Sequence, residues 1–105
     1  MEKPNLTFIH QLSGNDLEFE KELLMVIKTE FPKEKKEYFS AIKEKNFKKT
    51  EDSVHKLKHK ISILGLKNSY KLADEYESGL REKDNALQPR FNAVLATIEQ
   101  YLENF

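Results

Sequence analysis

The segment from His55 to Gly65, HKLKHKISILG, holds the residues whose types and spacing are best suited to chemistry. A histidine stands first, Lys58 follows three residues later, and a second histidine, His59, follows after four. Side chains three and four positions apart lie on the same side of a helix. An unprotonated imidazole nitrogen is a good nucleophile near neutral pH. The spacing points to a histidine that can be phosphorylated.

Both histidines are expected on the exposed side of a helix. The apolar residues of the segment cluster within about 80° on a helical projection and define a buried face: Val54, Leu57, Ile61 and Leu64. His55 then lies about 140° from the centre of that face and His59 about 180°, while Lys58 lies on its flank at about 80°. This placement argues against a core histidine. A solvated, lysine-rich face with two incidental histidines is the other interpretation.

Apolar side chains are also expected around His55. Ile63 and Leu66 project within about 80° of it on the outward side, and such a mixed patch suits a docking surface. The alternative is that the N-terminal segment or another helix covers both residues. Nearby lysines make the region locally basic and favour an acidic partner: Lys48, Lys49, Lys56, Lys58, Lys60, Lys67 and Lys71.

Composition argues against several classes of protein. In this chain of 105 residues, 18 lysines and arginines balance 18 acidic residues, and only Arg81 and Arg90 are arginines, so a nucleic-acid binder is not indicated. The lack of cysteine excludes disulfides, a thiolate nucleophile and a cysteine-based zinc site. No apolar run is long enough for a signal peptide or a membrane span. We expect a soluble, cytoplasmic monomer with no membrane or nucleic-acid partner.

Helices must position these residues, because apolar residues recur at spacings of three and four while glycine and proline fall between the periodic segments. Asn15 or Asp16 can cap the first long helix, and Pro32 is expected to end it or to begin the next, which stops near Asn46. Later helices are expected to begin near Phe47, around residues 67–69 and after a loop through residues 83–86. Their short loops favour antiparallel neighbours. The sequence predicts one all-α domain, residues 1–105, folded as an up-and-down antiparallel four-helix bundle with one or two additional short helices.

The central segment resembles the signature of histidine-containing phosphotransfer (HPt) domains, which carry phosphoryl groups in bacterial two-component phosphorelays. That signature has a histidine, leucine and lysine two and three residues later, and glycines at four and ten. The corresponding positions here are His55, Leu57, Lys58, His59 and Gly65. The resemblance covers nearly the whole chain, since GNDLEFEKELLMVIKTEFP is similar to the first core helix of the family and Tyr76-Glu77 takes the place of its leucine-acid pair.

This resemblance implies a function in signal transduction. His55 would accept a phosphoryl group from a receiver-domain aspartate, become phosphohistidine and pass the group to another receiver. Lys58 would stabilise the charge on the equatorial oxygens during transfer, and Glu77 would orient the imidazole by a hydrogen bond. The implied partners are response-regulator receiver domains and a hybrid histidine kinase, which would bind a surface made of Lys56, His59, Ser62, Ile63 and Leu66.

No cofactor or metal of the chain's own is implied. The sequence lacks the GxxxxGKS/T loop and the GxGxxG turn, so ATP-dependent kinase activity is not expected. Mg²⁺ would come from the acidic pocket of the receiver. His55 and His59 have the spacing of the zinc motif HExxH, but lysine replaces its glutamate and the neighbouring positive charge opposes a cation.

His59 is a departure from the HPt pattern, which usually has glycine at this position. The imidazole could crowd the receiver, donate a hydrogen bond to the phosphoryl group, or act as a second acceptor. The alternative function is a non-catalytic helical interaction module, a degenerate HPt domain that binds a receiver or kinase without phosphotransfer.

Overall fold

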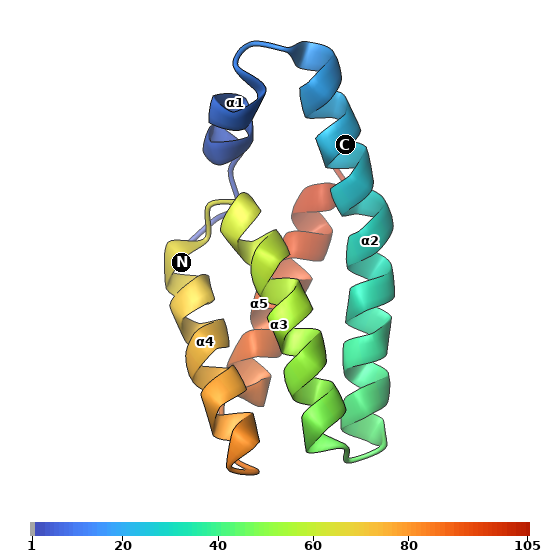
Figure 1. The fold of residues 1–105 in the computed structure, drawn as a ribbon, viewed down its shortest axis with the longest axis vertical. Helices are drawn as coiled ribbons and strands as arrows, with labels where there is room; N and C mark the ends of the chain where they lie inside the picture. Colours follow the sequence, from blue (N-terminus) through green and yellow to red (C-terminus); the bar gives the residue numbers. More distant parts are fainter. Residues whose placement is uncertain (1) are drawn as a thin grey trace.

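The computed structural model describes residues 2–105, and within that range the regular secondary structure is all helical, with no strand. This confirms the expected all-α class. The helices are α1 (Thr7–Ser13), α2 (Leu17–Lys43), α3 (Phe47–Ile63), α4 (Lys67–Arg81) and α5 (Gln88–Leu102) (Figure 1). Among the residues described, no helix has both the length and the apolar character needed to cross a membrane.

The four longer helices pack around one core. Helix α3 contacts α2 on one side and α4 on the other, while α5 contacts both α4 and α2. Consecutive long helices run in opposite directions, and the molecule is elongated, with principal extents of 44 × 23 × 19 Å (Figure 1). The short helix α1 packs against α2 and lies near the end of the molecule where α3 ends (Figure 1).

The helical projection of α3 correctly predicts its buried face. Three of its apolar positions, Val54, Leu57 and Ile61, are fully buried in the core, as is Leu64, the C-cap residue that follows α3. The start of α3 is capped by Asn46, whose side-chain oxygen accepts a hydrogen bond from the Lys49 amide, and Asp16 caps α2 in the same way. These caps satisfy amides that lack partners within the helix.

The expected break at Pro32 is wrong, because α2 continues through it from Leu17 to Lys43. Proline lacks the N–H that would bond to the carbonyl four residues earlier, but Pro32 is exposed, so water can reach that carbonyl. Phe31 and Tyr38, one on each side of the proline, are both buried in the same core. Packing of the two halves against one core outweighs the local cost of the proline.

A buried tyrosine pair connects α2, α4 and α5. The hydroxyl of Tyr38 donates to the side-chain oxygen of Asn92 at 2.7 Å and lies 2.9 Å from the hydroxyl of Tyr76. Since Tyr38 has only one hydroxyl hydrogen, Tyr76 must donate to Tyr38. Phe91 packs against both rings, with centroid distances of 5.3 and 5.2 Å. Burial raises the pKa of both tyrosines, so they are neutral at physiological pH.

This order of donation makes the two tyrosines unequal. We expect Tyr76→Phe to lower the free energy of unfolding by about 1 kcal/mol, because Tyr38 keeps its bond to Asn92. Tyr38→Phe leaves the Tyr76 hydroxyl without its acceptor and should cost about 1–3 kcal/mol. Urea denaturation of the two variants measures the difference. A larger loss in Tyr76→Phe would show that the donors are arranged in the opposite order.

The N-terminal segment crosses the turn between α3 and α4. The amide of Asn5 donates to the carbonyl of Leu64 at 2.8 Å, and the Glu2 carboxylate accepts from the amides of Asn68 and Ser69 at 2.9 and 3.0 Å. Gly65 takes a left-handed φ of +75°, and a Cβ there would lie 2.6 Å from the Asn5 side chain. Gly65 thus permits both the end of the helix and the close approach of the segment.

Glu2 should make stability dependent on pH. Burial disfavours its charge, but the backbone hydrogen bonds outweigh this effect and lower its pKa below the usual 4.5. A carboxylate whose pKa is lower in the folded state stabilises the protein above its unfolded pKa, and the contribution is lost as the pH falls through the folded pKa. We expect Glu2→Gln to cost about 0.5–1 kcal/mol at pH 7 and progressively less as the pH falls through the folded pKa of Glu2.

Thermal unfolding of wild type and Glu2→Gln from pH 7 to pH 3 tests this expectation. Glu22→Gln, at an exposed position on α2, is the control. A stability difference that stays constant over this pH range would contradict a role for the Glu2 charge.

Candidate functional site

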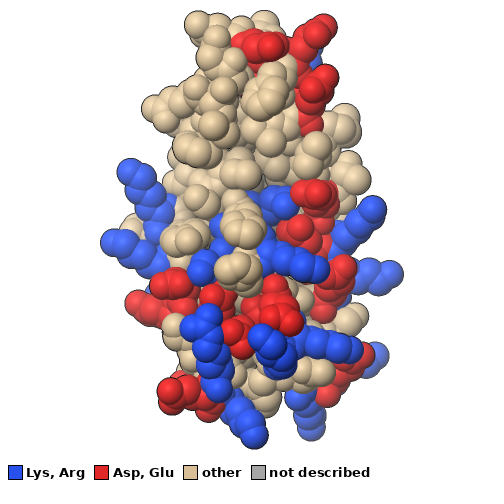
Figure 2. All heavy atoms as spheres, in the orientation of Figure 1, with Lys and Arg blue, Asp and Glu red and all other residues tan. Residues whose placement is uncertain are grey.

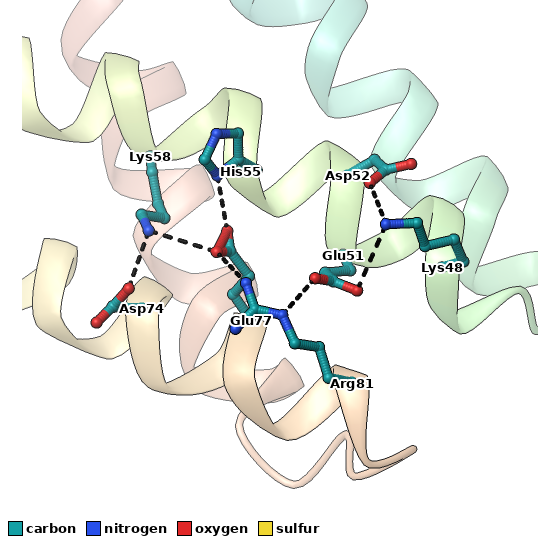
Figure 3. Close-up of polar contacts among 8 residues, drawn as sticks. All are labelled: Lys48, Glu51, Asp52, His55, Lys58, Asp74, Glu77 and Arg81. Atoms are coloured by element: carbon teal, nitrogen blue, oxygen red, sulfur yellow. Dashed lines mark hydrogen bonds and ion pairs between the residues drawn. The ribbon is translucent and has the colours of Figure 1, made fainter.

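His55 projects from α3 to the surface, and one ring nitrogen is held by α4. The side chain is 61% exposed, as the sequence predicted, and its Nδ1 lies 3.1 Å from Oε2 of Glu77 (Figure 3). A carboxylate only accepts hydrogen bonds, so the hydrogen must be on Nδ1. In neutral imidazole this leaves Nε2 with a free lone pair.

Glu77 is fixed by two cations as well as by His55. Its side chain is only 5% exposed, and its Oε1 lies 3.1 Å from the guanidinium of Arg81 and 3.5 Å from Nζ of Lys58. A buried carboxylate without such partners would be costly. The two cations hold the carboxylate in place, and the carboxylate in turn orients the ring of His55.

Lys58 is more buried than an ordinary surface lysine. Its side chain is 9% exposed, and its ammonium donates to Asp74 at 2.9 Å while also pairing with Glu77. Nζ also lies 5.3 Å from the centroid of the Tyr70 ring. Burial opposes the charge, but the hydrogen bond to Asp74 and the charge of Glu77 outweigh it and raise the pKa of Lys58. Lys58 is a permanent cation with two fixed anionic partners.

Arg81 extends this network toward the start of α3. Its Nε donates to Glu51 at 2.6 Å, and Lys48 pairs with Glu51 and Asp52 at 4.0 and 3.3 Å (Figure 3).

The sequence analysis did not predict Asp74 and Arg81 as residues of the site. Their spacing around Glu77 could have revealed them, because positions 74, 77 and 81 lie three and four residues apart and share one face of α4.

His59 lies beside His55 on the exposed side of α3. It is exposed as predicted, and the centroids of the two rings are 5.3 Å apart, with 73° between the ring planes.

The third histidine, His10, forms a histidine–glutamate pair like that of His55 and Glu77: it is 60% exposed and its Nδ1 lies 2.9 Å from Glu20. Within residues 2–105, no lysine or arginine forms an ion pair with Glu20, so that pair lacks the cations that fix Glu77.

The lysines of α3 are largely paired within the protein. Lys56 pairs with Glu37 at 3.3 Å, and the almost buried Lys60 pairs with Glu30 and Glu34 at 2.9 and 3.3 Å, all on α2. The expected basic patch is consequently weaker than its lysine count suggests. Figure 2 shows charges of both signs intermixed over α2, α3 and α4, whereas the end formed by α1 and the start of α2 carries mostly uncharged side chains on this face.

The expected exposure of Leu66 is wrong. Leu66 is only 1% exposed, and Ile63 is half-buried and packed against the core. The projection placed Leu66 as if the helix continued, but α3 ends at Ile63 and the chain turns at Gly65. Leu66 consequently points into the core rather than outward. Of the predicted docking residues, Lys56, His59 and Ser62 are exposed.

A groove continues the exposed side of α3 beyond His59. It has a volume of about 650 Å³ and lies between α1, the end of α3 and the start of α4. Ser62 lines it together with the partly exposed rings of Phe8 and Tyr70 and the amine-bearing side chains of Lys67 and Lys71. Ser62 is seven residues after His55, which places it about 10 Å further along the helix. Apolar contact area is thus available near His55, mainly on Phe8 and Tyr70, which were not predicted, while the predicted residues Ser62 and Leu66 also line the groove.

Comparison of the chain with models of known protein families, with characterised proteins and with solved structures finds no match. Among residues 2–105, no three histidine, aspartate or glutamate side chains come together in a way that could hold a metal ion. The function must be argued from the site itself.

We expect Glu77→Gln to change the tautomer of His55. The amide cannot pair with Lys58 and Arg81 as an anion does, and it can donate as well as accept, so the preference for hydrogen on Nδ1 should weaken. The free energy of unfolding should fall by about 1–3 kcal/mol. Ring ¹⁵N chemical shifts measure the tautomer, and Glu75→Gln, at an exposed position on the same helix, is the control. An unchanged His55 spectrum in Glu77→Gln would contradict the orienting role.

Proposed function

We propose that this chain is an HPt-like phosphocarrier, whose helices α2 to α5 form an up-and-down four-helix bundle and whose His55 carries the phosphoryl group between receiver domains. The observation that supports this most strongly is the exposed imidazole of His55, bound at Nδ1 by the buried Glu77, with Nε2 free. The closed ring of contacts among α2, α3, α4 and α5 supports the bundle.

The geometry suits attack on an aspartyl phosphate. The lone pair of Nε2 forms a bond to phosphorus while the bond from phosphorus to the aspartate oxygen breaks, and its electron pair returns to the receiver carboxylate. Nε2 has no hydrogen to lose, because the ring hydrogen is on Nδ1. The positive charge that forms on the ring lies against Glu77, 3.1 Å away. The same steps in reverse deliver the group to a second receiver.

Lys58 assists this reaction indirectly in our proposal. Its ammonium is bound to Asp74 and Glu77, so it holds the carboxylate that orients His55 and adds positive potential nearby. Lys58 is in this view a positioning residue. The direct clamp expected from the sequence would require it to leave Asp74.

Partners must supply the phosphoryl group, because the sequence has no nucleotide-binding loop. We propose receiver domains of response regulators and of a hybrid histidine kinase as these partners, with Mg²⁺ held by the receiver, in the cytoplasm. The groove lined by Ser62, Phe8 and Tyr70 provides apolar area for docking beside the exposed His55 and His59.

A degenerate HPt domain that binds a receiver without chemistry is the second candidate. It is favoured by two observations, the commitment of Lys58 to internal ion pairs and the imidazole of His59 at the position where the family usually has glycine. Binding and transfer are separable by experiment.

Transfer can be tested by incubating the protein with receiver domains phosphorylated with acetyl phosphate, in the presence of Mg²⁺. We expect acid-labile, base-stable label on wild type and none on His55→Gln. His10→Gln is a matched control, since His10 is also exposed and bound to a glutamate through Nδ1, and it should be labelled like wild type. Label as strong in His55→Gln as in wild type, or binding of a receiver without any label, would contradict the proposed carrier function of His55.

A further inference from the structure

We infer that His59 donates a hydrogen bond to the phosphoryl group when that group is on Nε2 of His55, and so stabilises the phosphorylated state. This inference rests on the proposed function and adds a residue to its site. From its position alone, His59 could crowd the receiver, donate a hydrogen bond to the phosphoryl group or accept that group itself. We assign it the role of hydrogen-bond donor.

The first argument is proximity. The ring centroids of His55 and His59 are 5.3 Å apart and the rings meet edge to face, at 73°. Both side chains are exposed on the same side of α3, and Nδ1 of His55 is turned toward Glu77. A phosphoryl oxygen lies two bonds beyond Nε2, outside the ring edge. A neighbouring imidazole that is one helical turn away is close enough to reach it through a ring N–H.

The second argument is that the nearby lysines are already engaged. Lys58 is 9% exposed and bound to two carboxylates on α4. Lys60 is almost buried and bound to two carboxylates on α2, and Lys56 also pairs with α2, at Glu37. His59 is the exposed donor that lies directly against His55.

The third argument is chemical. A phosphoryl group on nitrogen has three oxygens that share negative charge and accept strong hydrogen bonds. Imidazole has at least one N–H in each protonation state near neutral pH. It can donate to these oxygens without leaving an internal partner, whereas Lys58 cannot.

The equilibrium constant for transfer separates this role from the others. A residue that only crowds or guides the receiver changes the forward and reverse rates together and leaves the equilibrium constant unchanged. A hydrogen bond made only in the phosphorylated protein changes the equilibrium constant itself. The measurement uses the full chain and a receiver that labels wild type in the assay above. After acetyl phosphate has been removed from the phosphorylated receiver, the two proteins are mixed. The fraction of phosphoryl groups on each protein at equilibrium is then measured.

We expect His59→Ala to shift this equilibrium about tenfold toward the phosphorylated receiver, as expected for the loss of one hydrogen bond to a charged group. His59→Gln retains an N–H donor and should remain within about threefold of wild type, because its side-chain amide can also donate to a phosphoryl oxygen. His10→Ala removes another exposed histidine and should leave the equilibrium unchanged. Circular dichroism should show unaltered helix content, since His59 is exposed.

Two results would overturn the inference while leaving the carrier function intact. An equilibrium constant in His59→Ala equal to that of wild type, with faster transfer in both directions, would show that His59 merely crowds the receiver. Residual label in His55→Gln, well below that of wild type, that disappears in the double variant His55→Gln, His59→Gln would show that His59 is itself a secondary acceptor. Failure of wild type to take label from any receiver would instead overturn the proposed function, and this inference with it.

Discussion

The burial of the Glu77 carboxylate between α3 and α4 is the constraint on which the rest of the site depends. A charge that is 5% exposed needs partners on all sides, and these come from Lys58 and His55 on α3 and from Arg81 on α4 itself. Because these partners are on two helices, the carboxylate sets the register of one helix against the other. The orientation of the His55 ring follows from that register.

The same constraint explains how charge is distributed over α3. Lys58 is directed to α4 and Lys60 to α2, so the helix is held on both flanks by lysines with carboxylate partners. These lysines mainly form ion pairs within the protein. On the outward side of α3, the imidazoles of His55 and His59 contact each other directly. A lysine-rich sequence has thus produced a surface on which positive and negative charges alternate (Figure 2).

Sequence periodicity predicted what depends on a single helix. The buried face of α3, the exposure of His55 and His59 and the cap at Asp16, one of two candidates, follow from local spacing. Sequence periodicity wrongly predicted an exposed Leu66, because the helix ends before this residue. It also wrongly predicted a helix break at Pro32, where core packing outweighs the local preference of proline. The partners of Lys58 lie 16 and 19 residues away and those of Lys60 lie 30 and 26 residues away, all on other helices. No single-helix projection gives the register that brings them together.

All residues of the His55 network come from α3 and α4, which are consecutive helices joined by the turn at Leu64 to Leu66. The whole network spans positions 48 to 81, and its contacts between helices cross only the short turn that joins α3 to α4. Closing a short loop costs little entropy. The site is therefore encoded in one helical hairpin, which can assemble before α5 completes the core and before the N-terminal segment closes over the turn.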